Sequence, residues 1–167
     1  MLKHSLVLIV FLFSISTLNA QYLGFDDFIK ILDLAEERVE AEKFLKLNGF
    51  APYNFEYLTD SEDYEEGDTT SYLIDYYKKL PGDEYFVRVL GYTNDDMYTV
   101  MEFSSDEDRS FYFVDILSQA GLEPVDEWDD GDGNEGFKFE TKKYMMTLEK
   151  SPDDDGAMRY QFSISKY

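Results

Sequence analysis

The sequence predicts an α+β protein: an antiparallel sheet of up to eight strands, made from two α-β-β-β-β repeats, with the helices packed on one face. Three observations lead to this prediction. Two segments, 25–48 and 104–120, carry apolar residues at helical spacing. Each is followed by four short runs rich in Tyr, Phe and Val, with turn residues between them. In the second group, apolar and polar residues alternate, which is typical of strands with one buried and one solvated face.

The first helical segment carries two apolar stripes. The first stripe follows a 4-3-4 spacing and comprises Phe28, Leu32, Ala35 and Val39. A second set then takes over: Phe44, Leu45 and Leu47. The shift between the two sets fits one long helix or two short helices with a kink within 36–40. Gly49 is a typical residue to end the segment, and Pro52 cannot continue it.

Eight strands are expected, four after each helical segment. The first four cover 53–58, 72–79, 85–92 and 97–103, and the second four cover 124–128, 137–141, 144–150 and 158–165. Between the two groups, Ser104 and Glu107 have the spacing of a capping box, which predicts where the second helix starts. The apolar stripe of that helix comprises Phe113, Ile116, Leu117 and Ala120.

The two halves of the chain correspond in layout. Segments 49–52 and 121–124 both run from Gly to Pro directly after a helix, and the acidic loops 59–71 and 129–136 take equivalent places. We therefore expect a single domain over 21–167, with half-repeats of about 25–103 and 104–167.

The N-terminus has the layout of a secretory signal peptide. Lys3 lies in a short basic region, residues 6–13 are an unbroken apolar run, and Ala20 supplies a small residue before Gln21. Cleavage after Ala20 is expected, which makes 1–20 the signal peptide. The apolar run is too short to cross a membrane comfortably. The remaining chain is therefore expected in the periplasm or outside the cell, without membrane insertion.

Composition excludes several functions. The formal net charge of −21 disfavours binding to nucleic acid and favours cations or a basic protein partner. The chain has no Cys, and its one His is His4, inside the expected signal peptide. Catalysis by Ser-His-Asp or Cys-His groups and the usual zinc sites are therefore excluded. We expect a non-enzymatic protein. A carboxylate-based hydrolase is the second alternative, although no pair of acids stands out as the pair that such an enzyme needs.

The acidic stretch 129–136, DDGDGNEG, has some features of a calcium loop. Counted from Asp130, the residues at positions 1, 3 and 5 fit an EF-hand, but Glu135 replaces its Gly and Thr141 replaces its final Glu. An EF-hand is thus excluded. Two interpretations remain: a Gly-rich turn, which we favour, and a looser calcium site. Its ligands would be Asp130, Asp132, Asn134 and Glu135. Calcium is the one cofactor left open, and a calcium-binding protein is the first alternative function.

Aromatic residues suggest a recognition surface. In the first group of strands both faces carry aromatic or apolar residues, so either both faces are covered or one exposes an aromatic patch. Exposed Tyr, Trp and Arg provide rigid contact area for protein partners. The candidates for partner binding are Tyr77, Phe86, Arg88, Tyr92 and Trp128. For each of them a place in the core is the alternative. The leading hypothesis is therefore an exported, acidic binding protein with a protein partner.

Two resemblances point the same way. Segments 24–28 (GFDDF) and 44–50 (FLKLNGF) resemble the opening of uncharacterised exported bacterial proteins, over about residues 22–58. The duplicated layout of a helix and four strands is similar to the β-lactamase-inhibitor-protein architecture. That resemblance implies a sheet that grips a protein partner, and it assigns no binding residues here.

Overall fold

The computed structural model describes residues 22–58, 71–92 and 97–166. The described helices are α2 (Phe25–Leu34), α3 (Arg38–Leu47) and α4 (Glu107–Gln119). The strands of the first half are β1 (Ala51–Leu58), β2 (Ser71–Leu80), β3 (Asp83–Tyr92) and β4 (Met97–Ser104). Those of the second half are β5 (Asp126–Asp129), β6 (Glu135–Glu140), β7 (Tyr144–Pro152) and β8 (Met158–Lys166).

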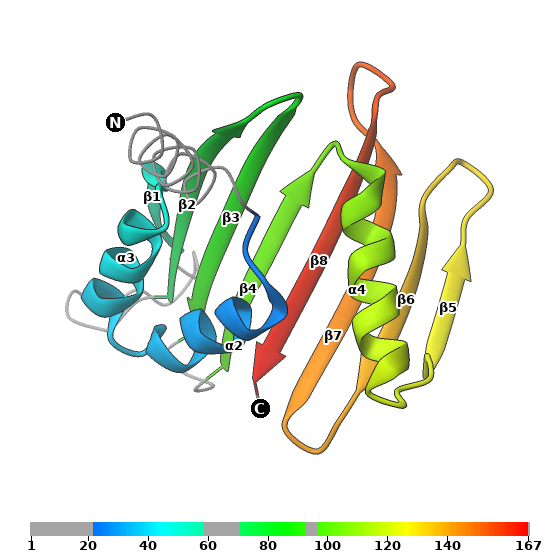
Figure 1. Cartoon of the computed structure of the whole chain (residues 1–167), viewed down its shortest axis with the longest axis horizontal. Helices are drawn as coiled ribbons and strands as arrows, with labels where there is room; N and C mark the ends of the chain where they lie inside the picture. The colour runs from blue at the N-terminus through cyan, green and yellow to red at the C-terminus, as the bar shows by residue number, and fades with distance from the viewer. Residues whose placement is uncertain (1–21, 59–70, 93–96, 167) are drawn as a thin grey trace, which may run out of the picture.

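All eight strands form one antiparallel sheet in the order β1-β2-β3-β4-β8-β7-β6-β5. Each half is a meander of four consecutive strands, and the last strands of the two halves, β4 and β8, pair antiparallel at the centre (Figure 1). The two meanders are therefore related by an approximate two-fold axis perpendicular to the sheet. The predicted α+β class and the antiparallel sheet of eight strands are confirmed.

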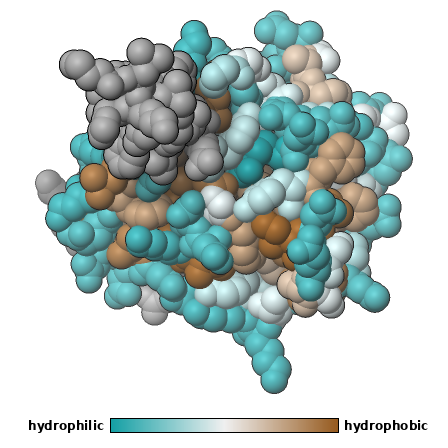
Figure 2. Space-filling view, viewed as in Figure 1, coloured by the Kyte–Doolittle hydropathy of each residue, from teal (hydrophilic) through white to brown (hydrophobic). Residues whose placement is uncertain are grey.

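The three helices lie on the same face of the sheet (Figure 1). The core lies between these two layers, and its apolar residues alternate along most strands. Leu73 on β2 and Ser163 and Ser165 on β8 are buried on the opposite face, and the burial of the two serines differs from the predicted solvated face of the second half. On β3 the buried apolar side chains are Tyr85, Val87 and Val89, and on β7 they are Met146 and Leu148. The ring of Phe113 on α4 stacks on Phe162 of β8, with 3.8 Å between the ring centroids. Figure 2 shows the outer surface of this helix-covered side, which is mostly hydrophilic with scattered apolar patches.

The first helical segment is two helices, with a break between Leu34 and Arg38. Phe28, Leu32 and Ala35 are buried as predicted. Val39 was placed in the same stripe, but it is 55% exposed, because the break at 35–37 turns the next helix to a different face. The described part of the chain thus has two helices before its first four strands and one before its second four.

The predicted capping box of the second helix is wrong. Asp106 is the N-cap of α4, and its carboxylate accepts a hydrogen bond from the backbone N–H of Asp108. Ser104 still belongs to β4, where its hydroxyl donates to the carboxylate of Asp83, 2.8 Å away. The backbone N–H of Ser105 donates to the same carboxylate, at 2.9 Å. The sequence pattern predicted that the Ser104 hydroxyl caps the helix, but this hydroxyl donates to Asp83 on the neighbouring strand instead.

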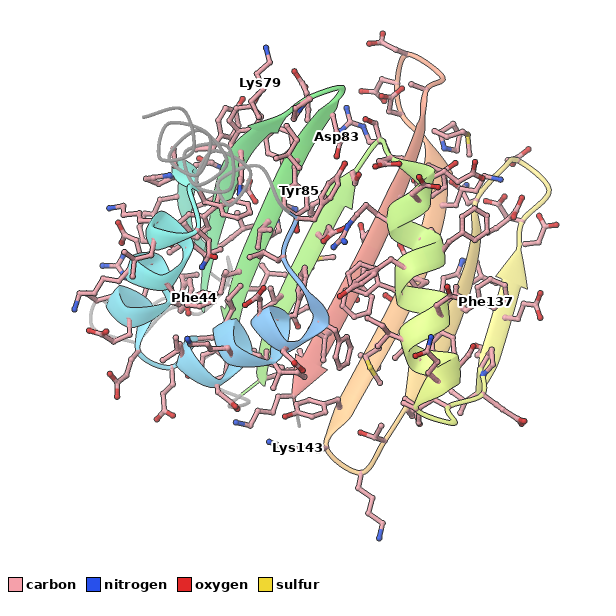
Figure 3. All side chains as sticks on the ribbon, in the orientation of Figure 1. Phe44, Lys79, Asp83, Tyr85, Phe137 and Lys143 are labelled. Atoms are coloured by element: carbon pink, nitrogen blue, oxygen red, sulfur yellow. The ribbon has the colours of Figure 1, made fainter. Side chains whose placement is uncertain are left out.

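A buried ion pair joins α4 to the sheet. The guanidinium of Arg109 donates from Nε and Nη2 to the carboxylate of Glu102, both at 2.7 Å, and the Tyr85 hydroxyl donates to the same carboxylate. Arg109 also donates to the backbone oxygen of Leu23, and the N–H of Leu23 donates to Tyr85. Figure 3 labels Tyr85 and Asp83 near one end of β3, and the hydroxyl of Tyr22, in the segment that leads into α2, donates to the carboxylate of Asp83. The helix-covered face thus holds the start of the described chain in place.

The expected signal peptide, 1–20, lies outside the described residues. Among the residues that the structure describes, no helix is both long and apolar enough to span a membrane.

Candidate functional site

The candidate site lies on the face of the sheet opposite the helices, which we call the open face. Its side chains alternate with those of the core, so Phe86 and Arg88 point here while their neighbours on β3 point to the helices. Strand register places one row of open-face residues straight across the sheet. The row runs Tyr77, Phe86, Phe103, Gln161, Glu149, Gly136 and Trp128.

Three aromatic side chains form a cluster at the β1–β3 end of this row. The ring of Tyr77 lies 5.0 Å from that of Phe86 between centroids, and Tyr53 lies 5.7 Å from Phe86 and 6.5 Å from Tyr77. The pairing of β1 with β2 shifts register between Pro52 and Asn54, a bulge at Tyr53. A bulge re-aims a side chain, and Tyr53 is 71% exposed. Beside a half-buried Phe86, this makes an accessible aromatic surface.

Arg88 borders the cluster and is held rigidly. Its Nε and Nη2 donate to the two carboxylate oxygens of Asp75 on β2, at 2.7 and 3.0 Å. Its guanidinium lies 5.4 Å from the centre of the Phe103 ring, a cation–π contact. These hydrogen bonds to Asp75 raise the pKa of Arg88 above its ordinary value. The side chain keeps 35% of its surface exposed, so it is a fixed cation at the rim of the aromatic cluster.

A hollow of about 240 Å³ opens between these residues. It is lined by Tyr53, Asp75, Phe86, Arg88, Phe103 and Arg159. The last of these comes from β8, so the hollow uses four strands of the first half and one of the second. We call these six residues together with Tyr77 the aromatic–arginine patch.

The middle of the open face has a different character. Here hydroxyl groups pair across strands: Thr99 with Ser165 at 2.8 Å between oxygens, and Thr147 with Ser163 at 2.6 Å. The amide of Gln161 donates to Glu149, and burial raises the pKa of that carboxyl group. These groups hydrogen bond to one another, so this part of the face already has its polar partners.

Trp128 lies apart from the patch. It is on the edge strand β5, and β4, β8, β7 and β6 separate that strand from β3. At about 4.8 Å per strand, this is roughly 24 Å. The Trp128 ring lies flat over Gly136, where a Cβ atom would come within 2.0 Å of it. The ring covers backbone that the glycine leaves bare, a structural role that suits an edge strand.

Three of the five predicted partner-binding residues come together: Tyr77, Phe86 and Arg88. The side chain of Tyr92 lies outside the described residues, and Trp128 is at the far end of the sheet. Sequence reasoning missed Tyr53, Asp75, Phe103 and Arg159. Alternation along β4 and β8 could have put Phe103 and Arg159 on the polar face, but only strand order places β8 beside β4.

The acidic loop 130–135 takes the geometry of a turn. One carboxylate oxygen of Asp130 accepts from the backbone N–H groups of Asp132 and Asn134, and the other accepts from the Asn134 side chain. These bonds lower the pKa of Asp130. Glu135 lies 3.5 Å from Lys150. Within the described ranges, no group of three His, Cys, Asp or Glu side chains could hold a metal ion. The loop geometry matches the favoured turn, and calcium binding stays an untested prediction.

Charge on the open face is nearly balanced, unlike the chain as a whole with its net −21. By strand register its described basic residues are Lys79, Arg88, Lys138 and Arg159, and its acidic residues are Glu56, Asp75, Glu84, Asp126, Glu140 and Glu149. Most of the excess negative charge therefore lies elsewhere in the chain.

Comparison of the chain with protein-family models, with curated proteins and with solved structures returns no match.

Proposed function

We propose that this is an exported, non-enzymatic binding protein that takes a protein partner on the open face of its sheet. The observation that carries the proposal is the aromatic–arginine patch on a face whose charges nearly balance. The cores of protein interfaces are enriched in aromatic residues, Met and Arg and depleted of other charges. Met97, Met101 and Met145 also lie on this face by strand register.

The charge distribution favours a partner with an apolar centre and a basic rim. The excess negative charge that lies elsewhere in the chain attracts the basic rim of such a partner during diffusion, while the patch supplies the contact area. We therefore expect the rate of association to fall as salt concentration rises.

The hollow lacks what a carboxylate-based hydrolase needs. Such enzymes use two acids about 5–10 Å apart. Among the described residues that line the hollow, Asp75 is the only acid, and both of its oxygens accept from Arg88. The chain after His4 has no His and no Cys. These features support binding as the function.

The test compares two single substitutions in the protein purified from the exported fraction of cells. Phe86→Ala removes the centre of the patch. Leu47→Ala is the matched control, because Leu47 is an apolar residue on α3 that is 84% exposed. Partners captured from the envelope fraction are identified, purified and titrated against each variant. We expect Phe86→Ala to weaken binding at least tenfold, as central interface aromatics do, and Leu47→Ala to change it less than twofold. Equal affinities for the two variants would overturn the proposal.

A further inference from the structure

Both described arginines of the open face line the hollow in the patch. Four arginines lie in the described residues, and two of them face elsewhere: Arg38 lies over Phe55 at 5.1 Å, and Arg109, on α4, is buried between that helix and the sheet. The other two, Arg88 and Arg159, both line the hollow. The other described residues of the lining are one acid, Asp75, and the aromatic residues Tyr53, Phe86 and Phe103. The lining is thus locally cationic in a chain of net charge −21.

The two arginines differ in how many donors they have left. In Arg88, Nε and Nη2 already donate hydrogen bonds to Asp75. Arg159 donates within the described part of the chain only from Nε, to Asp153 at 3.2 Å, and its side chain is 44% exposed. Both terminal nitrogens of Arg159 are therefore available. A guanidinium recognises a carboxylate through paired, nearly parallel hydrogen bonds.

The size of the hollow limits what can occupy it. Pockets for drug-sized ligands and cofactors measure about 300–1,000 Å³, and this one measures about 240 Å³. One or two side chains of a protein partner fill such a volume. Tyr53 and Phe86 supply the apolar walls for an aromatic ring, beside the free donors of Arg159.

We propose that the hollow is the anchor pocket for an acidic side chain, Asp or Glu, that stands next to an aromatic residue in the partner. Arg159 takes the carboxylate, Arg88 adds a fixed positive charge, and Tyr53 and Phe86 pack on the ring. This inference rests on the proposed function and adds the chemistry of the partner: an acidic–aromatic pair at the centre, inside a basic rim.

Dipeptide probes test the pocket without the partner. N-acetyl-Glu-Phe-amide carries the acidic side chain, N-acetyl-Gln-Phe-amide is its neutral match, and N-acetyl-Gln-Phe with a free carboxyl end offers the same charge from a chain terminus. Each is titrated into the purified protein while NMR follows the ring protons of Tyr53 and Phe86. We expect the Glu probe to bind about tenfold more tightly than the neutral probe, because its charged hydrogen bonds form against aromatic walls.

Three substitutions test whether Arg159 binds the carboxylate of the Glu probe. Arg159→Gln should remove the tenfold preference for the Glu probe. Arg38→Gln, the control on the helix-covered side, should leave it unchanged. Asp153→Asn keeps the oxygen that accepts the backbone N–H groups of Asp155 and Ala157. It weakens the competing contact with Arg159, so affinity for the Glu probe should rise about twofold.

Three results would overturn the inference: no shift of the ring protons with any probe at 10 mM, equal binding of the Glu and Gln probes, or tighter binding of the probe with the free carboxyl end. The proposed function fails by a different result. It is wrong if Phe86→Ala captures the envelope partner as well as the wild type does, even when the wild type binds the Glu probe as expected.

Discussion

The two faces of β3 differ although their residues alternate along a single strand. Tyr85, Val87 and Val89 pack under the helices and are buried. Phe86 and Arg88, one step along the chain, lie half-buried on the open face beside Tyr53 and Tyr77. The first set completes the core, while the second set stays partly accessible. This apolar and cationic surface, which the fold leaves accessible, is the feature on which the proposed binding role rests.

The open face also differs between its middle and its β1–β3 end. In its middle the hydroxyls of Thr99, Ser165, Thr147 and Ser163 are paired across strands. At the β1–β3 end, rings and a guanidinium remain accessible. The predictions below test whether the helix-covered face carries stability while the patch carries binding.

The largest effect is expected from Glu102→Ala on the helix-covered face. This change leaves the Arg109 guanidinium buried without its carboxylate, and breaking a buried pair in this way costs about 3–5 kcal/mol. Urea denaturation should show this loss in the free energy of unfolding. Glu140→Ala, which removes an exposed pair with Lys138, is the control and should cost less than about 1 kcal/mol. Similar losses for the two variants would contradict the contrast between the faces.

Neighbouring substitutions on β3 sharpen the contrast. Val87→Ala should destabilise the protein by about 2 kcal/mol, because it removes two buried methyl groups and leaves a cavity. Phe86→Ala removes many more atoms, yet we expect about 1 kcal/mol, since its ring is already partly in water. The midpoint of thermal unfolding measures both. A greater loss for Phe86→Ala would mean that Phe86 belongs to the core.

The pH dependence of stability should reflect the protonation of the Asp83 carboxyl group. Burial alone would raise the pKa of its carboxyl group, but hydrogen bonds from Ser105, Ser104 and Tyr22 outweigh burial and lower it below 3.8. Because the folded pKa lies below the unfolded one, this contribution is present above about pH 3.8. It is lost as pH falls below that value. Asp83→Asn should be less stable than the wild type at pH 7, and the gap between them should narrow below pH 4 in urea denaturation.

The smallest effect is expected in the turn 130–135. Asp130→Ala removes the acceptor of two backbone N–H groups and should lower the midpoint of thermal unfolding slightly. If the loop is a turn only, this loss is the same with and without millimolar calcium. A thermal shift of the wild type on adding calcium, absent in Asp130→Ala, would instead support the calcium site.

Much of the fold follows from local pattern. Alternation from Phe137 to Ile164 correctly predicted that Phe139, Met146 and Leu148 are in the core, but Ser163 and Ser165, which it placed on the solvated face, are buried as well. Capping was less predictable, because Ser104 had a competing acceptor, Asp83, on another strand. The ion pair of Glu102 and Arg109 could not be predicted either. The local pattern does not show whether these two charged side chains point into the core or to solvent.

The sequence by itself determined the fold class, the number of strands, the acidic balance and the absence of Cys and of His beyond residue 4, because these depend on composition and on short-range spacing. Only the tertiary structure decided what meets on the open face. Tyr53, Arg88 and Arg159 are far apart in the chain. A bulge in β1, the pairing of β2 with β3, and the meeting of β4 with β8 bring them around one hollow. Such contacts are set by strand order and register, which local pattern leaves free.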